Sequence, residues 1–240
     1  MERAALAVVR QPTVEIVTPV HNEERNLERS VRRLRAYLDA CFPFRTTVTI
    51  ADNASTDATY EIGARLAEGI DGVRYLRISD RERGRAVAAA WLTSRADVVA
   101  YIGLDPSAHL EALLPLVAPV ASGHSEVACG LRLNRDAVSR AYDAILGTVL
   151  GTHFAGAGCG WIAIRGDVAR RLVPQVENRN RFFDIELFVL AQRAGLRIAE
   201  LRIDWAGDGP RPLEDLAGVW RLLRSRLRAK GLKVMTADGA

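Results

Sequence analysis

Three groups of polar side chains each follow a short apolar run in the sequence. The groups are Pro19, His21, Asn22 and Glu23; Asp52, Asn53 and Asp57; and Asp105 with Ser107. If the apolar runs are parallel strands, the groups line one crevice at the carboxyl ends of those strands, where open α/β sheets bind ligands. Polar groups converging from three strand ends suit a nucleotide with a diphosphate and a sugar. Taken singly, Ser55 and Asp57 are typical helix caps, and Asn22 and Asn53 typical turn residues.

Apolar periodicity predicts the elements that position these groups. Short β-rich runs alternate with longer helical stretches, which is typical of an α/β fold with a mostly parallel sheet covered by helices on both faces. We expect strands at residues 14–19, 47–52, 73–76, 98–102, 126–129, 160–165 and 197–205. We expect helices at 24–40, from the cap residues 55–57 to about 67, and at 84–94, 109–120, 137–150 and 183–194. The glycine-rich segment 151–160 is expected to form a loop beneath a site, because glycine lets the backbone approach a ligand closely.

Composition indicates one large domain over residues 1–240 and a cytoplasmic protein. The chain has 240 residues, of which 49% are hydrophobic, and a formal net charge of +4 that is too mild and dispersed to indicate a nucleic-acid partner. Its three cysteines lack metal-ligand spacing, so we expect them to be reduced and mostly buried. The apolar run 4–9 is too short for a signal peptide, and no stretch approaches the roughly 18 to 20 apolar residues of a membrane span.

A basic helix and tail are expected over about residues 213–240. The cations Arg221, Arg224, Arg226, Arg228, Lys230 and Lys233 have no acid among them. Such a helix could make peripheral contact with an anionic membrane or with an acidic partner. It could equally be the solvated end of a helix with no partner.

The order of several motifs resembles the family 2 glycosyltransferases of the GT-A fold, and within them the dolichyl-phosphate mannose synthase and polyprenyl-phosphate glycosyltransferase group. The resemblance covers a core of about residues 12–228. It rests on the segments 18–24 (TPVHNEE), 51–59 (ADNASTDAT), 83–86 (RGRA), 130–132 (GLR), 139–142 (SRAY), 159–161 (CGW), 182–187 (FFDIEL) and 204–205 (DW).

The resemblance implies roles for individual residues. The donor is expected to be a nucleotide diphosphate sugar, with UDP or GDP as the nucleotide. The residues expected to border it are Pro19, His21, Glu23, Asp52, Asn53, Arg85 and Asp105. Within this set His21 replaces a usual Tyr, Asp52 would bind the base, and Asp105 is the last acid of an Asp-x-Asp motif that holds Mg²⁺ or Mn²⁺ between the donor phosphates. Arg132 is expected at the catalytic centre, and Arg135, Ser139 and Trp161 at the acceptor. Trp161 has the commoner alternative of a place in the core.

The chain departs from the family pattern at the metal motif and in the glycine-rich loop. Gly103 stands where the first metal-binding acid is usual, so the cation would be weakly held or dispensable. His109 stands where relatives have a further acid. It could be a polar metal ligand, but a residue at the start of a helix, with no metal, is the simpler interpretation. Gly156 and Gly158 replace polar residues, which removes a candidate base.

Inverting transfer needs a group that takes the proton of the acceptor hydroxyl, unless the acceptor is a phosphate. Asp184 and Glu186 are the candidates. They lie two residues apart near a helix start, so they diverge, and we expect only one to face the site and the other to cap the helix or pair on the surface. The alternative is that both acids only support the N-terminus of the helix. The short connection 134–138 weakens a polyprenyl-phosphate acceptor and leaves room for a small metabolite or another sugar.

The sequence therefore predicts an inverting transferase that moves a hexose or N-acetylhexosamine to a hydroxyl or phosphate. The alternative is a nucleotide-sugar-binding or scaffold protein that has lost turnover, which Gly103, Gly156 and Gly158 would explain. Nucleotidyl transfer is disfavoured, because the segment 19–23 contains neither the glycine nor the lysine of a phosphate loop.

Overall fold

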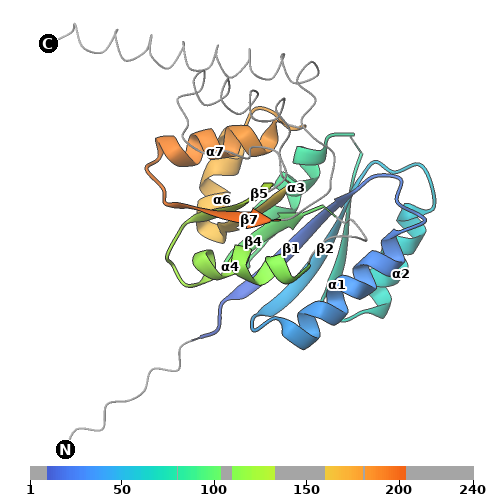
Figure 1. The fold of residues 1–240 in the computed structure, drawn as a ribbon. Coiled ribbons are helices and arrows are strands. Elements are labelled where there is room, and N and C mark those ends of the chain that lie inside the picture. The colour runs from blue at the N-terminus through green and yellow to red at the C-terminus, as the bar shows by residue number, and fades with distance from the viewer. Residues whose placement is uncertain (1–9, 80, 104–109, 133–159, 181, 204–240) are drawn as a thin grey trace, which may run out of the picture.

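The computed structural model describes residues 10–79, 81–103, 110–132, 160–180 and 182–203 of the chain. Across these residues one seven-stranded sheet has the strand order β3-β2-β1-β4-β6-β5-β7 (Figure 1). Its strands are β1 (Thr13–Val20), β2 (Arg45–Asn53), β3 (Val73–Ile78), β4 (Val98–Ile102), β5 (Val127–Arg132), β6 (Trp161–Arg165) and β7 (Ile198–Ile203). Strand β6 runs antiparallel to β4 and β5, whereas the other pairs are parallel. The predicted mostly parallel α/β sheet is confirmed.

Helices cover both faces of the sheet. The helices are α1 (Leu27–Cys41), α2 (Thr59–Gly69), α3 (Arg83–Thr93), α4 (Leu113–Ala121), α6 (Gly166–Leu172) and α7 (Phe183–Arg193), with short 3-10 turns η1 (Leu110–Ala112) and η2 (Val173–Gln175). One buried cluster joins α1, α2 and α4 to one face of the sheet, and a second joins α3, α6 and α7 to the other.

The sequence explains these two layers. In α1 the apolar residues Leu27, Val31, Leu34 and Leu38 recur at helical spacing and are all buried, which makes one stripe of the helix apolar. All five residues of β4 are buried, as expected for a central strand with helices on both faces.

Several details differ from the sequence-based expectations. Helix α6 and turn η2 were not predicted, and the helix expected at 109–120 begins as η1 and continues as α4 with Pro119 inside it. Cys129 is buried, but Cys41 is exposed, so the expectation of mostly buried cysteines is wrong there. The helix at 137–150, the glycine-rich residues 151–159, Cys159 and the basic C-terminal helix lie outside the described residues. Among the described helices, none has the length and apolar character to cross a membrane.

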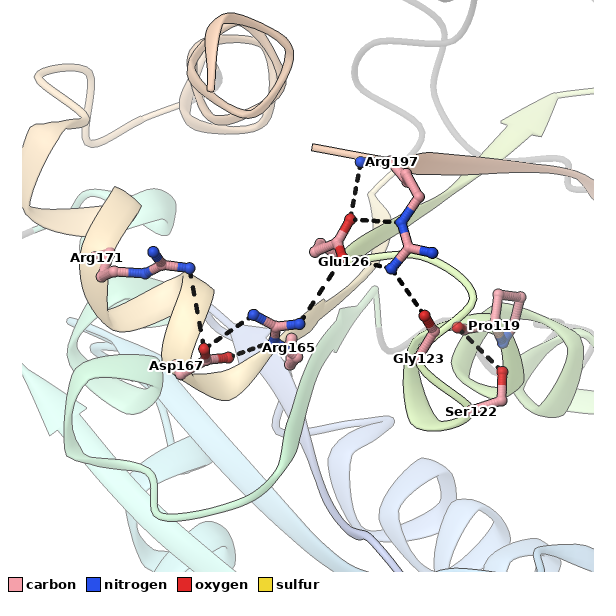
Figure 2. A network of polar contacts seen from close by, with 8 residues as sticks. All are labelled: Pro119, Ser122, Gly123, Glu126, Arg165, Asp167, Arg171 and Arg197. Carbon is pink, nitrogen blue, oxygen red and sulfur yellow. Dashed lines mark hydrogen bonds and ion pairs between the residues drawn. The ribbon is translucent and has the colours of Figure 1, made fainter. Parts of the chain in front are cut away.

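A network of charges ties β5, β6 and β7 together at the edge where β5 and β7 begin (Figure 2). Glu126 accepts hydrogen bonds from the backbone nitrogen of Arg197 at 2.9 Å and from its Nη2 at 2.6 Å. Arg165 lies 3.8 Å from Glu126 and donates to Asp167 at 2.6 Å. The side-chain hydrogen bond from Arg197 is the main cause that lowers the pKa of Glu126 to about 2.

We expect Glu126→Gln to be less stable than the wild type at pH 7, with the difference shrinking as the pH falls. A carboxyl whose pKa is lowered by folding stabilises the folded state above its unfolded pKa, here 4.5, and this contribution is lost as the pH falls from 4.5 toward about 2. Urea unfolding from pH 7 to pH 3 measures the effect. Glu177→Gln, at an exposed position, is the control. A stability difference that stays constant over this range would contradict the prediction.

Candidate functional site

The carboxyl ends of four parallel strands lie along one edge of the sheet (Figure 1). Val20, the last residue of β1, is aligned with Asp52 of β2, and Val17 is aligned with Tyr101 of β4. The register of β2 with β3 aligns Asn53 with Ile78. His21, which follows β1, and Asp52, near the end of β2, therefore lie together at this edge, as the sequence predicted.

The loop after β1 is hydrogen-bonded to the loop after β2. His21 Nδ1 lies 2.8 Å from the carbonyl oxygen of Asn53. The backbone nitrogen of Asn22 donates to Ser55 Oγ at 3.0 Å, and the backbone nitrogen of Thr56 donates to Asn22 Oδ1 at 2.8 Å. Ser55 thus joins the two loops. It does not act as a helix cap, which is the usual role of a serine at such a position.

The same two loops contain backbone conformations that most side chains avoid. Asn22 has φ 56° and Ala54 has φ 55°. Asparagine tolerates this left-handed region, but for alanine it costs on the order of 1–3 kcal/mol. The hydrogen bonds between the loops hold both residues there, and such strain is concentrated at functional sites.

Side chains at and just before the start of α2 hold backbone groups of the β1 loop. The backbone nitrogen of Glu23 donates to Thr59 Oγ1 at 2.8 Å, and that of Glu24 donates to Asp57 Oδ2 at 3.2 Å. Asp57 Oδ1 also accepts from the backbone nitrogen of Thr59, the first residue of α2, at 3.0 Å. Asp57 therefore has the cap-like role that the sequence indicated.

Asp52 is fully buried and is held by two donors. Its Oδ1 accepts from the backbone nitrogen of Ser55 at 2.9 Å, and its Oδ2 accepts from the hydroxyl of Tyr75. Burial and the hydrogen bond to Asp52 raise the pKa of Tyr75 well above its usual range. Arg77 Nε lies 3.9 Å from the same Oδ2. A carboxylate has about four acceptor positions, so a contact between Asp52 and a base stays a prediction.

Asn53 has an acceptor without a hydrogen-bond partner. Asn53 is only 8% exposed, and its Oδ1 is buried with no hydrogen-bond donor in the described part of the chain. Buried polar atoms are nearly always hydrogen-bonded, so an unsatisfied one at this edge of the sheet is a candidate for contact with a ligand or water.

A second polar cluster lies where α7 meets β4. Asp184 is 1% exposed, and its Oδ2 accepts from the hydroxyl of Tyr101 at 2.9 Å. Arg83, at the start of α3, has its Nη2 3.5 Å from the same oxygen and its guanidinium 5.7 Å from the centre of the Tyr101 ring. A carboxylate, a phenol and a guanidinium from three elements thus meet close to the end of β4.

Glu186 diverges from Asp184, as predicted, but the expectation that the second acid caps the helix or pairs on the surface is wrong. Glu186 is 6% exposed and its Oε2 accepts from the backbone nitrogen of Asn178 at 2.7 Å. The helix buries both acids because α7 packs on the sheet with most of its surface covered.

Gly84 allows α3 to approach the start of α7. A Cβ atom at this position would lie 2.6 Å from the Cβ of Phe183 and 2.8 Å from the carbonyl oxygen of Arg179. No side chain fits there, so glycine keeps Arg83 beside Asp184. Arg85 instead pairs with Glu82 at 2.9 Å, and its proposed contact with the donor stays a prediction.

Trp161, Pro19 and Arg132 are the other predicted site residues that the structure describes. Trp161 is 1% exposed and belongs to the core, the alternative that the sequence left open. Little of its surface is therefore available to an acceptor. Pro19 lies near the end of β1, and Arg132 is the last residue of β5. Asp105, Arg135 and Ser139 lie outside the described residues, as does His109.

The described residues do not by themselves make a metal site. No group of three or more His, Cys, Asp or Glu side chains within the described ranges is arranged to hold an ion. Gly103, directly after β4, has open space around it, since a Cβ atom there would have no heavy atom within 4 Å. The cation expected at Asp105 would need donors from outside the described residues.

A model of the family described as glycosyl transferase family 2 matches residues 15–190. The chain belongs to this family. Glycosyltransferase AglD of Haloferax volcanii is 33% identical over 219 residues, which cover 86% of this chain and 35% of that protein. Dolichyl-phosphate beta-glucosyltransferase of Mus musculus is 25% identical over 220 residues, covering 79% of this chain and 66% of that protein. The matched part thus spans about a third of the length of the first relative and two thirds of the second.

Solved structures agree with the fold. Glucosyl-3-phosphoglycerate synthase from Mycobacterium tuberculosis, in complex with Mn²⁺, UDP-glucose and phosphoglyceric acid, has a TM-score of 0.68 and 19% sequence identity. The match covers 91% of this chain and 79% of that one. The GT-A type of α/β fold predicted from the motif order is therefore confirmed.

Sequence reasoning missed three residues of these clusters. Arg83 belongs to the RGRA segment, from which only Arg85 was predicted to contact the donor. Tyr75 and Tyr101 lie inside strands, where an aromatic residue is usually part of the core. Each contacts a carboxylate from a distant element. A buried tyrosine usually finds a partner for its hydroxyl, which is the one signal that could have indicated the two tyrosines.

We expect Tyr75→Phe to lower the free energy of unfolding by about 1–3 kcal/mol, because it leaves the buried Asp52 carboxylate short of a donor. Tyr60→Phe is the matched control, since Tyr60 packs edge-on against Tyr75 but is 45% exposed. Urea unfolding of both variants gives the comparison. Equal stability of the two variants would show that the Tyr75 hydroxyl does not hold Asp52.

Proposed function

We propose that this chain binds a nucleotide diphosphate sugar at the carboxyl edge of β1, β2 and β4 and transfers its hexose or N-acetylhexosamine, with inversion, to an acceptor hydroxyl or phosphate. The observation that carries the proposal is the meeting of the β1 and β2 loops, in which His21 contacts Asn53 and Val20 is aligned with Asp52. Family membership supports transfer over a binding protein without turnover.

The donor would lie across the two loops. The unsatisfied Oδ1 of Asn53 is available to a donor group of the ligand, and His21 is half-buried beside it. The proposed border residues Pro19 and Glu23 flank this position along the chain. The solved structure of similar fold was obtained with UDP-glucose, which supports a nucleotide sugar as the class of donor.

The acceptor would approach from the side of Asp184. In a transfer with inversion the acceptor oxygen forms a bond to the anomeric carbon, and the bond from that carbon to the diphosphate oxygen breaks. A hydroxyl acceptor must lose its proton, for which Asp184 is the proposed base, with Arg83 and Tyr101 fixing the carboxylate. Glu186 would position the segment at Asn178. Arg132, Arg135 and Ser139 remain the proposed contacts to donor and acceptor phosphates, and Trp161 the proposed aromatic neighbour.

A phosphate acceptor would relax the need for a base because it arrives deprotonated. A small metabolite, another sugar and a polyprenyl phosphate are therefore the acceptor classes proposed, and the name of the mouse relative supports the last. With a lipid acceptor the protein would work on the cytoplasmic surface of a membrane, in peripheral contact through the basic segment 213–240. No role for nucleic acid is proposed.

Mg²⁺ or Mn²⁺ is proposed as a weakly held, dispensable cofactor. Such an ion neutralises the charge that develops on the leaving diphosphate. Asp105 would be its protein ligand, and the Mn²⁺ in the solved structure of similar fold supports the class of metal.

Purified protein is expected to transfer sugar from a UDP- or GDP-linked donor, and Asp184→Asn to lower kcat by about 10²–10⁴-fold with a hydroxyl acceptor, the usual contribution of a general base. With a phosphate acceptor the loss should be much smaller, while KM for the donor changes little in both cases. Asp167→Asn, on the opposite edge of the sheet, is the control. Absence of donor binding and of donor hydrolysis by the wild type would rule out the proposal.

Gly103→Asp is expected to make nucleotide binding depend more strongly on Mn²⁺, because it restores a carboxylate where the structure has open space. Stabilisation by a ligand follows mass action, so a tenfold tighter complex adds about 1.4 kcal/mol of stability at saturation. Thermal shifts with UDP and GDP, with and without Mn²⁺, give the measurement. Gly69→Asp also enters open space, at the far end of α2. Identical responses to Mn²⁺ in both variants would argue against a metal at this edge.

A further inference from the structure

A pocket lies at the opposite edge of the sheet from the candidate site. Its volume is about 550 Å³, within the usual range for small-molecule sites. It is formed where β1, β2 and β3 begin and where α3 ends. Its lining residues are Arg10, Thr13, Val14, Glu15, Arg45, Thr46, Thr47, Arg74, Thr93, Arg95 and Ala96. The length of β1, about 23 Å at 3.3 Å per residue, separates it from the candidate site.

Four arginines from separate segments line this pocket. Arg10 forms an ion pair with Asp97 at 3.0 Å. The guanidinium groups of Arg45, Arg74 and Arg95 make no hydrogen bond or ion pair with any of the residues that the structure describes. The guanidinium group is a fork of donors suited to phosphate oxygens, and three of these forks are free here.

The strand register explains why the cations gather on one face. Thr13 is aligned with Arg45, and Glu15 is aligned with Thr47. Because side chains alternate along a strand, Arg45 and Thr47 lie on the same face of β2 as the residues that α3 covers further along. Helix α3 ends at Thr93, so the beginnings of the strands are left uncovered.

The one acid of the lining does not neutralise these arginines. Glu15 is 5% exposed, and its Oε1 accepts from the hydroxyl of Thr49 at 2.6 Å. No arginine of the described chain is paired with it. The pocket therefore keeps an excess of positive charge around a buried carboxylate, and like charges around one cavity repel each other unless an anion joins them.

We propose that this pocket binds a phosphate-bearing ligand, independently of the donor crevice. The free guanidinium groups of Arg45, Arg74 and Arg95 hold the phosphate oxygens. Glu15, deeper in the pocket, accepts from a hydroxyl of the ligand, and Thr47 contributes a further hydroxyl. Phosphate on a soluble molecule and phosphate in a lipid headgroup offer the same chemistry to these side chains.

Calorimetric titration of the full chain with inorganic pyrophosphate tests the proposal. We expect saturable binding that the double variant Arg74→Gln/Arg95→Gln weakens at least tenfold. The double variant Arg29→Gln/Arg193→Gln removes two exposed arginines of α1 and α7 and should bind as the wild type does. Arg83→Gln, in the candidate active site, should also leave the binding unchanged.

Three results would overturn the proposal. The first is the absence of saturable binding. The second is equal weakening by the two double variants, which would indicate only a general charge effect. The third is loss of binding in Arg83→Gln but not in Arg74→Gln/Arg95→Gln, which would place pyrophosphate in the candidate active site.

Co-sedimentation with vesicles distinguishes the source of the phosphate. Sedimentation with phosphatidylglycerol but not phosphatidylcholine vesicles, lost in Arg74→Gln/Arg95→Gln, assigns the pocket to a lipid headgroup. Pyrophosphate binding without such sedimentation assigns it to a soluble phosphate.

Discussion

The parallel register of β1 with β2 and β4 is the constraint on which the candidate site depends. Because Val20 stands opposite Asp52, the loops that follow the two strands start side by side, and His21 reaches the carbonyl of Asn53. A shift of the pairing by one residue would turn every side chain of β1 to the opposite face, against a different layer of helices, and would move Val20 out of alignment with Asp52. The register thus brings the two loops of the candidate site together. The strained backbone of Ala54 is a local cost of this arrangement, held by hydrogen bonds between the loops.

A second close approach completes the site from the other face of the sheet. Gly84 lets the first turn of α3 lie against α7, where a single Cβ atom would collide with Phe183. This brings Arg83 to Asp184 while the hydroxyl of Tyr101 reaches the same carboxylate oxygen from the sheet. Removing one member would leave a buried charge or donor unpaired, which is costly in a low-dielectric interior. The three side chains thus hold each other in place before any ligand is bound.

The sheet and the position of the β1 and β2 loops could be predicted from the sequence. Apolar runs indicate the strands, and the polar residues after them indicate the carboxyl edge of the sheet. The alternation of runs predicted the sheet, and the order of motifs predicted the family. The antiparallel direction of β6 could not be predicted, since strand direction leaves no local pattern in the side chains. Asp184 and Glu186 were both candidates for the base, and one of them was expected to cap the helix or pair on the surface; in the fold Glu186 is buried and holds a backbone nitrogen, a contact with residue 178 that the local sequence does not reveal. The bonds of Tyr75 and Tyr101 join residues 23 and 83 positions apart, which no periodicity reveals.

The use of the acids at the carboxyl edge bears on how a diphosphate would be bound. Asp52, Asp57 and Glu24 accept hydrogen bonds from backbone groups, and Asp184 is covered by Tyr101 and Arg83. Carboxylates engaged in this way shape the crevice instead of presenting free oxygens to a cation. Gly103 adds no acid at the end of β4. Within the described residues, the acids of this edge therefore offer little to a cation, and a metal ion bound with a diphosphate would need ligands from Asp105, phosphate and water.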